Sequence, residues 1–339
     1  MILRIFGLLI LMVFYFGFIS FSGFFILTIF SHLLSAILLL WYSFRAGGFG
    51  FSNNWRTFTV AEYKELVHFS WYHLLMGLSL FVIGFLDSLM LAALSEDGVS
   101  SVPVYTIAVF ITTLMTIPYR AIINAVFPVL NRAYIDQKKD EFYDLFARSS
   151  VNIQIVAIAM VIIIGFNLPN AVRVLPKGYE SVLPVVWILM LGRMADMATG
   201  MNNEVISISS LYKFNFRISV FLIALLVLLN RILIPIYSIY GAAWGTTIAM
   251  ILFNTAKTIY LRRKMNLWPF SIRSLAILFA GGLAGAVAYC MPYIGNPVAD
   301  AIIRSLAILI VYILLLLRLR PSPDLNNFVT KIFNRIKTH

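Results

Sequence analysis

Long apolar stretches alternate with short polar segments along the whole chain. Ten stretches are long enough to cross a bilayer, because a helix needs about 20 apolar residues to span the hydrocarbon core. They lie approximately at residues 5–22, 24–44, 67–94, 103–127, 151–168, 182–201, 218–237, 242–261, 272–291 and 301–317. Backbone groups in lipid must be satisfied within the chain, and these stretches lack the period-two alternation of barrel strands. The pattern therefore predicts an all-α polytopic membrane protein.

Composition supports this prediction and excludes several classes of function. Hydrophobic residues make up 61% of the chain and charged residues 12%, against about 25% charged in a soluble domain. The net charge is +12, but the basic residues are scattered over loops and the tail, so nucleic acid is not an expected partner. Cys290 is the only cysteine, and the four histidines lack zinc-site spacing. No metal or cofactor is expected.

No enzyme is predicted. The chain has no Gly-rich phosphate loop followed by Lys-Ser or Lys-Thr, so it is not expected to hydrolyse nucleotides. The loops lack the paired carboxylates of glycosyl chemistry, and none is as large as the outer loop expected of a glycan polymerase or ligase.

The loops predict the orientation of the chain, because short cytoplasmic loops carry the excess of Lys and Arg. The basic loops lie within residues 45–64, 132–148, 213–217 and 262–273. The alternate loops are acidic at Glu96 and Asp97, mixed near residues 173–180 and almost uncharged around Gly295. With an even number of spans, both termini are expected in the cytoplasm.

Four local patterns stand in order along residues 67–261, separated by whole predicted helices. They are Leu86-Asp87-Ser88 followed by residues 102–108 (VPVYTIA), residues 126–132 (VFPVLNR), residues 177–180 (KGYE) and residues 233–246 (LIPIYSIYGAAWGT). Pro128 is expected to end its helix, and Gly241 to let two helices approach closely after a tight outer turn. Together the patterns resemble the multidrug/oligosaccharidyl-lipid/polysaccharide exporter superfamily, in particular its bacterial lipid-linked oligosaccharide flippases. The resemblance implies a MATE/flippase-like bundle.

The chain also departs from the family pattern. Members usually have a basic residue after the aspartate and a glycine before the tyrosine of the first pattern, where this chain has Ser88 and Val104. Members usually carry twelve or fourteen helices in two six-helix lobes, and by this resemblance the first four helices are missing. The incomplete N-terminal lobe has three competing explanations: a start codon placed too late, a disrupted gene, or a half-transporter that pairs with another subunit.

On this basis the chain divides into five parts. They are two helices of the first lobe (1–44), a cytoplasmic connector (45–66), a six-helix second lobe (67–261), two additional helices (262–318) and a basic cytoplasmic tail (319–339). The tail has apolar residues at helical spacing among basic ones, so we expect it to lie on anionic lipid headgroups.

Two charged residues lie in the middle of the sixth predicted span. Arg193 and Asp196 are three residues apart and therefore share one helical face. A central Arg costs about 2.5 to 3.5 kcal/mol on insertion scales, so it is expected to face the protein interior or a wet cavity. Given the resemblance, Arg193 would attract the pyrophosphate of a lipid-linked sugar, and Asp196 would hold Arg193 or exchange a proton. The alternative is a mutually neutralised structural pair.

Asp87 and Arg120 are further candidates. Asp87 would bind a coupling H+ or Na+ near the outer surface, or else make a helix-packing hydrogen bond. Arg120 would contact the substrate phosphate from the cytoplasmic side, or else extend to the lipid headgroups. Weaker candidates at the inner end of the sixth span, for which solvation is the simpler interpretation, are Glu204, Asn202 and Asn203.

These features predict a flippase that moves a polyprenyl-pyrophosphate oligosaccharide to the outer leaflet of the bacterial cytoplasmic membrane during surface polysaccharide assembly. It would work by alternating access around a central polar cavity. Membrane lipids, a polysaccharide polymerase and chain-length machinery are the other candidate partners. The alternative is a cation-coupled exporter of drugs or metabolites on the same scaffold. Cationic drugs favour acidic and aromatic walls, whereas two buried arginines, Arg193 and Arg120, favour an anionic load.

Overall fold

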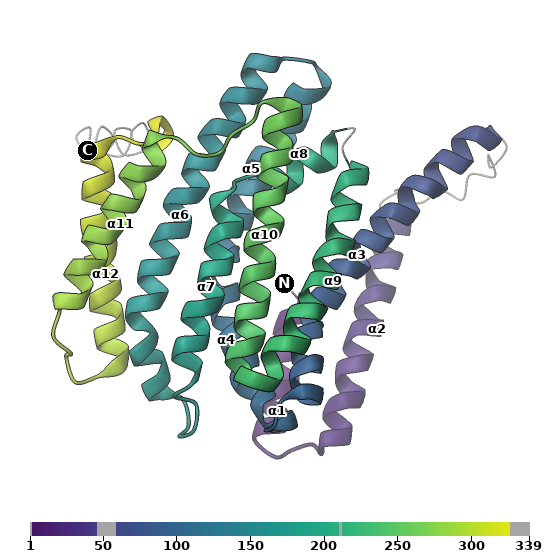
Figure 1. Cartoon of the computed structure of the whole chain (residues 1–339). Helices are drawn as coiled ribbons and strands as arrows, with labels where there is room; N and C mark the ends of the chain where they lie inside the picture. Colours follow the sequence, from purple (N-terminus) through teal and green to yellow (C-terminus); the bar gives the residue numbers. More distant parts are fainter. Residues whose placement is uncertain (1, 46–58, 210–211, 326–339) are drawn as a thin grey trace. The chain divides into compact units, whose positions relative to one another are not determined.

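The computed structural model describes residues 2–45, 59–209 and 212–325, and all regular structure within these ranges is helical (Figure 1). Residues 1–70 and residues 71–339 form two compact units, which are described one at a time. In the described ranges, six helical segments are long and apolar enough to cross a membrane, or seven if one bent pair counts as a single span. The chain is therefore an all-α, multi-pass membrane protein.

The helices follow one another with short connections. In chain order they are α1 (Ile2–Tyr15), α2 (Phe21–Arg45), α3 (Val60–Leu94), the 3-10 helix η2 (Gly98–Ser101), α4 (Val102–Thr113), α5 (Thr116–Ile135), α6 (Lys139–Val174), α7 (Val182–Ala198), α8 (Asn202–Ile208), α9 (Tyr212–Tyr237), α10 (Ile239–Met265), α11 (Ile272–Cys290) and α12 (Pro297–Leu319).

The first unit is built on a helical hairpin. Helices α1 and α2 pack against each other, and the ring of Phe14 lies 5.1 Å from that of Phe24. No α2 residue is buried, so the apolar surface of this helix is available to lipid. Most of the predicted connector and most of the predicted tail, residues 46–58 and 326–339, lie outside the described residues.

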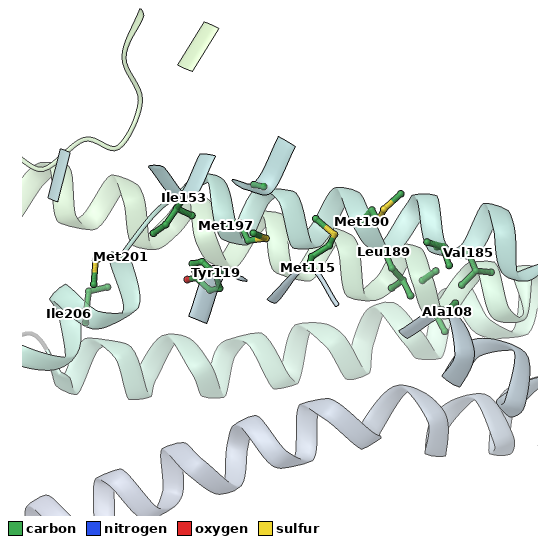
Figure 2. Close-up of a cluster of buried hydrophobic side chains, with 14 of the residues drawn as sticks. Ala108, Met115, Tyr119, Ile153, Val185, Leu189, Met190, Met197, Met201 and Ile206 are labelled. Atoms are coloured by element: carbon green, nitrogen blue, oxygen red, sulfur yellow. The ribbon is translucent and has the colours of Figure 1, made fainter. Parts of the chain in front are cut away.

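The second unit is a bundle in which α7 and α10 are central. Helix α10 packs against α9 and α7, α4 packs against α7, and α6 contacts α5, α7, α11 and α12. The core between them is apolar, and Figure 2 shows side chains such as Met115, Val185, Leu189 and Met197 meeting in it. The burial of these side chains fixes which face of α7 is turned to its neighbours.

The loops of the second unit gather at two ends. Figure 1 shows the α6–α7, α9–α10 and α11–α12 connections at one end, and the α5–α6 and α10–α11 connections at the other. The hydroxyls of Ser95, after α3, and Ser238, between α9 and α10, are 2.8 Å apart at the first of these ends. The basic loops are therefore separated from the acidic and neutral ones, as the alternation of spans requires.

Two helix boundaries differ from the sequence prediction. The predicted span at 103–127 consists of α4 and α5, which are separated at Leu114 and Met115. Pro118 accounts for this break, because a proline clashes with the carbonyl of the residue four positions earlier. Pro128 was expected to end its helix, and that prediction is wrong: it lies inside α5, which continues to Ile135. Neighbouring helices make such internal prolines tolerable in membrane bundles.

The tight turn expected between the seventh and eighth spans is confirmed. Helix α9 ends at Tyr237 and α10 begins at Ile239, so Ser238 alone connects them, with φ +50°. A Cβ on Gly241 would lie 2.2 Å from the carbonyl oxygen of Leu233. Only glycine therefore allows the two helices to approach this closely.

Candidate functional site

The candidate site is centred on a break between α7 and α8, whose axes bend by 47°. Gly200 lies at the break with φ +68°, and a Cβ there would meet the Ser150 hydroxyl at 2.3 Å. Both the backbone conformation and the available space therefore require glycine. Discontinuous helices that expose polar groups are the usual place of substrate and ion sites in transporters.

Arg193 and Asp196 lie on the last turns of α7, before the break, and both are half-buried. Among the described residues, Arg193 and Asp196 form no ion pair with each other, and neither side chain has a hydrogen-bond partner. The guanidinium of Arg193 interacts electrostatically with Asp87 and Tyr105. Arg193 and Asp196 therefore do not form the mutually neutralised pair, and the guanidinium N–H groups of Arg193 make no hydrogen bond to a described residue.

Asp87 is buried at the centre of a hydrogen-bond network that joins four helices. Its Oδ1 accepts from the Asn230 amide at 2.7 Å. Its Oδ2 accepts from the hydroxyls of Tyr105 at 2.8 Å and Thr246 at 2.5 Å. The helix-packing hydrogen bond expected as one alternative is thus present, since the donors come from α4, α9 and α10. The coupling role of Asp87 stays a prediction.

Lys257 is a site residue that the sequence reasoning missed. It lies on α10 and is fully buried. Its ammonium donates to the Asn203 amide oxygen at 2.6 Å and lies 3.9 Å from the centre of the Phe253 ring. Lys257 falls inside the predicted span 242–261, where a charged side chain is costly, so it could have been identified in the same way as Arg193.

Two of the weaker candidates on α8, Asn203 and Glu204, interact with this lysine. Glu204 and Asp196 both interact electrostatically with Lys257 and with each other. Asn202 is buried, and its Oδ1, the Oε2 of Glu204 and the Oδ1 of Asn254 are buried without a hydrogen-bond partner. The structure therefore differs from the simple solvation expected for Glu204 and Asn202.

Arg120 on α5 is exposed, in contrast to the expectation that both arginines are buried. Its neighbour Tyr119 is buried, interacts electrostatically with Asp196 and Glu204, and donates a 3.4 Å hydrogen bond to the carbonyl oxygen of Gly200. The structure thus connects α5 to the break mainly through Tyr119, which belongs to the same apolar cluster as Met197 and Met201 (Figure 2).

A second buried charged group, also missed from the sequence, lies on α12. Arg304 forms an ion pair with Asp300 at 3.0 Å, and Asp300 also accepts from the Asn170 amide at 2.6 Å. Arg304 further donates to backbone carbonyl oxygens at the end of α11, those of Ala288, Met291 and Pro292. The ion pair lies within α12, and the other contacts join α12 to α6 and to the end of α11, which is typical of a structural role.

A groove in the second unit is apolar and therefore does not suit a charged ligand. An apolar groove of about 460 Å³ lies between α6, α7 and α11, and its lining includes Ile162, Trp187 and Gly282. No group of three or more His, Cys, Asp or Glu side chains in the described ranges is arranged to hold a metal ion. The break between α7 and α8 is therefore the better candidate for binding charge.

Comparison with known proteins gives no family assignment: no protein-family model, no characterised protein and no solved structure matches this chain.

Proposed function

We propose that this protein is a flippase that carries a lipid-linked, negatively charged oligosaccharide across the bacterial cytoplasmic membrane for surface polysaccharide assembly. The proposed substrate is a polyprenyl-pyrophosphate oligosaccharide, with the headgroup in a polar cavity and the lipid tail in the bilayer. In this proposal the chain has ten transmembrane helices in a MATE/flippase-like bundle, and both termini lie in the cytoplasm.

One observation carries the proposal: Arg193 is a half-buried guanidinium on α7, which together with α8 is long and apolar enough to cross a membrane, and it has no ion pair or hydrogen bond to any described residue. A charge in this position is costly unless it has a partner. A guanidinium is well suited to a diphosphate, because its planar donors match pairs of phosphate oxygens. An anionic headgroup would supply the missing partner, and exposed Arg120 would meet the substrate from the inner side.

Two further observations support the proposal. The basic and the acidic or neutral loops lie at opposite ends of the second unit (Figure 1), which favours basic loops in the cytoplasm. Asp87 lies within electrostatic reach of Arg193, and Asp196 one helical turn from it. These two carboxylates remain our candidates for coupling headgroup binding to a cation.

The test is deletion of the gene in its host, followed by mass spectrometry of membrane polyprenyl-linked oligosaccharides. We expect a completed but untransferred lipid-linked oligosaccharide to accumulate, and the wild-type gene to reverse this. Arg193→Ala should fail to reverse it, whereas Arg231→Ala, which changes an exposed arginine on α9, should succeed. An unchanged pool of lipid-linked oligosaccharides in the deletion strain would contradict the proposal.

A cation-coupled exporter of drugs or metabolites is the second candidate. It is favoured by Asp196 and Glu204, two carboxylates at the helix break that could meet a cationic load. Increased sensitivity of the deletion strain to cationic compounds, with no change in lipid-linked oligosaccharides, would support this candidate instead.

A further inference from the structure

A buried lysine in contact with a broken membrane helix needs an explanation of its own. Lys257 is 0% exposed, and it forms no ion pair with any described residue. Its contacts are the Asn203 amide oxygen at 2.6 Å and the face of the Phe253 ring at 3.9 Å. Because a buried charge must be compensated, the negative groups around Lys257 determine what this site can do.

Those negative groups are Asp196 on α7 and Glu204 on α8, and we name the set Asp196, Glu204 and Lys257 the Lys257 cluster. Two carboxylates and one ammonium are electrically neutral only when one of the carboxylates carries a proton. Net charge in a low-dielectric interior is costly. The cluster therefore favours one proton bound to a carboxylate, in addition to the protons of the Lys257 ammonium.

Glu204 is the better carrier of this proton. Its Oε2 is buried and has no hydrogen-bond partner, and an ionised oxygen in that position would bear the full cost of desolvation. Asp196 has no hydrogen-bond partner either, and both residues are half-buried as a whole, but no oxygen of Asp196 is fully buried in the way that Oε2 of Glu204 is, so Asp196 can reach water or a polar ligand. The proton is thus placed on Oε2, and Asp196 stays ionised opposite Lys257.

The remaining charged and titratable groups around the cluster do not change this balance. On α7, Arg193 interacts with Asp87 and Tyr105. On α5, Tyr119 is buried and uncharged in its ordinary state, and Arg120 is exposed. On α9, Arg217 near the same end is exposed as well, so solvent screens it.

We propose that the Lys257 cluster is a proton-binding site in which Glu204 carries the exchangeable proton. The proton comes from water at the inner end, forms an O–H bond with Oε2, and returns to water when that bond breaks. A link to transport rests on the proposed function. An anion on Arg193 adds negative charge one helical turn from Asp196, so anion binding and proton binding strengthen each other.

The proton site itself is tested without any substrate. Infrared difference spectra of the purified full chain in nanodiscs, recorded between acidic and basic pH, report protonated carboxyl groups by their carbonyl band. We expect a titrating band that is lost in Glu204→Gln and retained in Glu141→Gln, which changes an exposed glutamate at the same end of the bundle. A band unaffected by Glu204→Gln, or no such band in the wild type, would overturn the proton site.

The link to transport is tested by calorimetry with farnesyl pyrophosphate as the probe, in two buffers of different ionisation enthalpy. We expect binding to the wild type with uptake of up to one proton, and binding without uptake in Glu204→Gln. Binding to the wild type without proton uptake would overturn the link and leave the proposed function standing. Absence of binding would overturn the link and count against the proposed function, while the infrared result still decides the proton site.

Discussion

The Asp300–Arg304 pair on α12 and the Arg193–Asp196 pair on α7 place opposite charges within one turn of a helix, but only the first pair is closed. Arg304 contacts Asp300 at 3.0 Å and three backbone carbonyls besides. Arg193 and Asp196 make no such contact with any described residue. A charged pair that is closed by an ion pair and by hydrogen bonds to neighbouring segments holds helices together, whereas a half-buried pair without such contacts can meet a ligand.

The largest effect on stability is expected at the closed pair. Arg304→Ala should lower the free energy of unfolding by about 3–5 kcal/mol, because it leaves Asp300 buried without its counter-ion. Denaturant unfolding of the solubilised protein measures this effect, with Arg231→Ala as the exposed control. Equal stability of the two variants would show that the α12 pair is not the structural one.

The next largest effect is expected where helices approach most closely. Gly241→Ala should cost about 1–3 kcal/mol, because the new Cβ would lie 2.2 Å from the Leu233 carbonyl oxygen and force α9 and α10 apart. Gly282→Ala on α11 is the matched control, since a Cβ there meets nothing within 4 Å. The same unfolding measurement applies, and a Gly282→Ala variant as unstable as Gly241→Ala would contradict the packing described for the α9–α10 turn.

A smaller loss is expected when one donor is removed from Asp87. Thr246→Val keeps the shape of the side chain but removes a 2.5 Å hydrogen bond to the buried carboxylate, at a cost of about 1–2 kcal/mol. Thr106→Val, at an exposed threonine on α4, should have little effect. If both variants unfold alike, the hydrogen bond from Thr246 to Asp87 does not contribute to stability.

The smallest effect on stability is expected at Arg193. Arg193→Ala should change the free energy of unfolding by less than about 1 kcal/mol, because the side chain has no ion pair or hydrogen bond with a described residue to lose, only a longer-range interaction with Asp87 and Tyr105. This result, measured beside Arg304→Ala, would sharpen the contrast between the two pairs. A loss as large as that of Arg304→Ala would show that Arg193 is structural.

Much of the fold could be predicted from the sequence because the apolar stretches are long. The all-α class, the tight turn before α10 and the close approach at Gly241 all follow from local patterns. The effect of Pro128 could not be predicted, because neighbouring helices decide whether a proline ends a helix or is tolerated within it.

The candidate site was only partly predictable for a similar reason. The positions of Arg193 and Asp196 in mid-span are visible in the sequence, but their lack of partners is a property of the packed helices. Lys257 also lies inside a predicted span, yet its proximity to Glu204 depends on the bend at Gly200. Contacts that join distant segments carry no local signal.

The central claim is that Arg193 is left free to bind an anionic headgroup. Its most direct test is movement of the host's lipid-linked oligosaccharide across proteoliposomes that contain wild-type or Arg193→Ala protein, matched for insertion and for unfolding stability. We predict that the wild type moves the lipid and that the stably inserted Arg193→Ala protein does not. Equal movement by both proteins would contradict the claim.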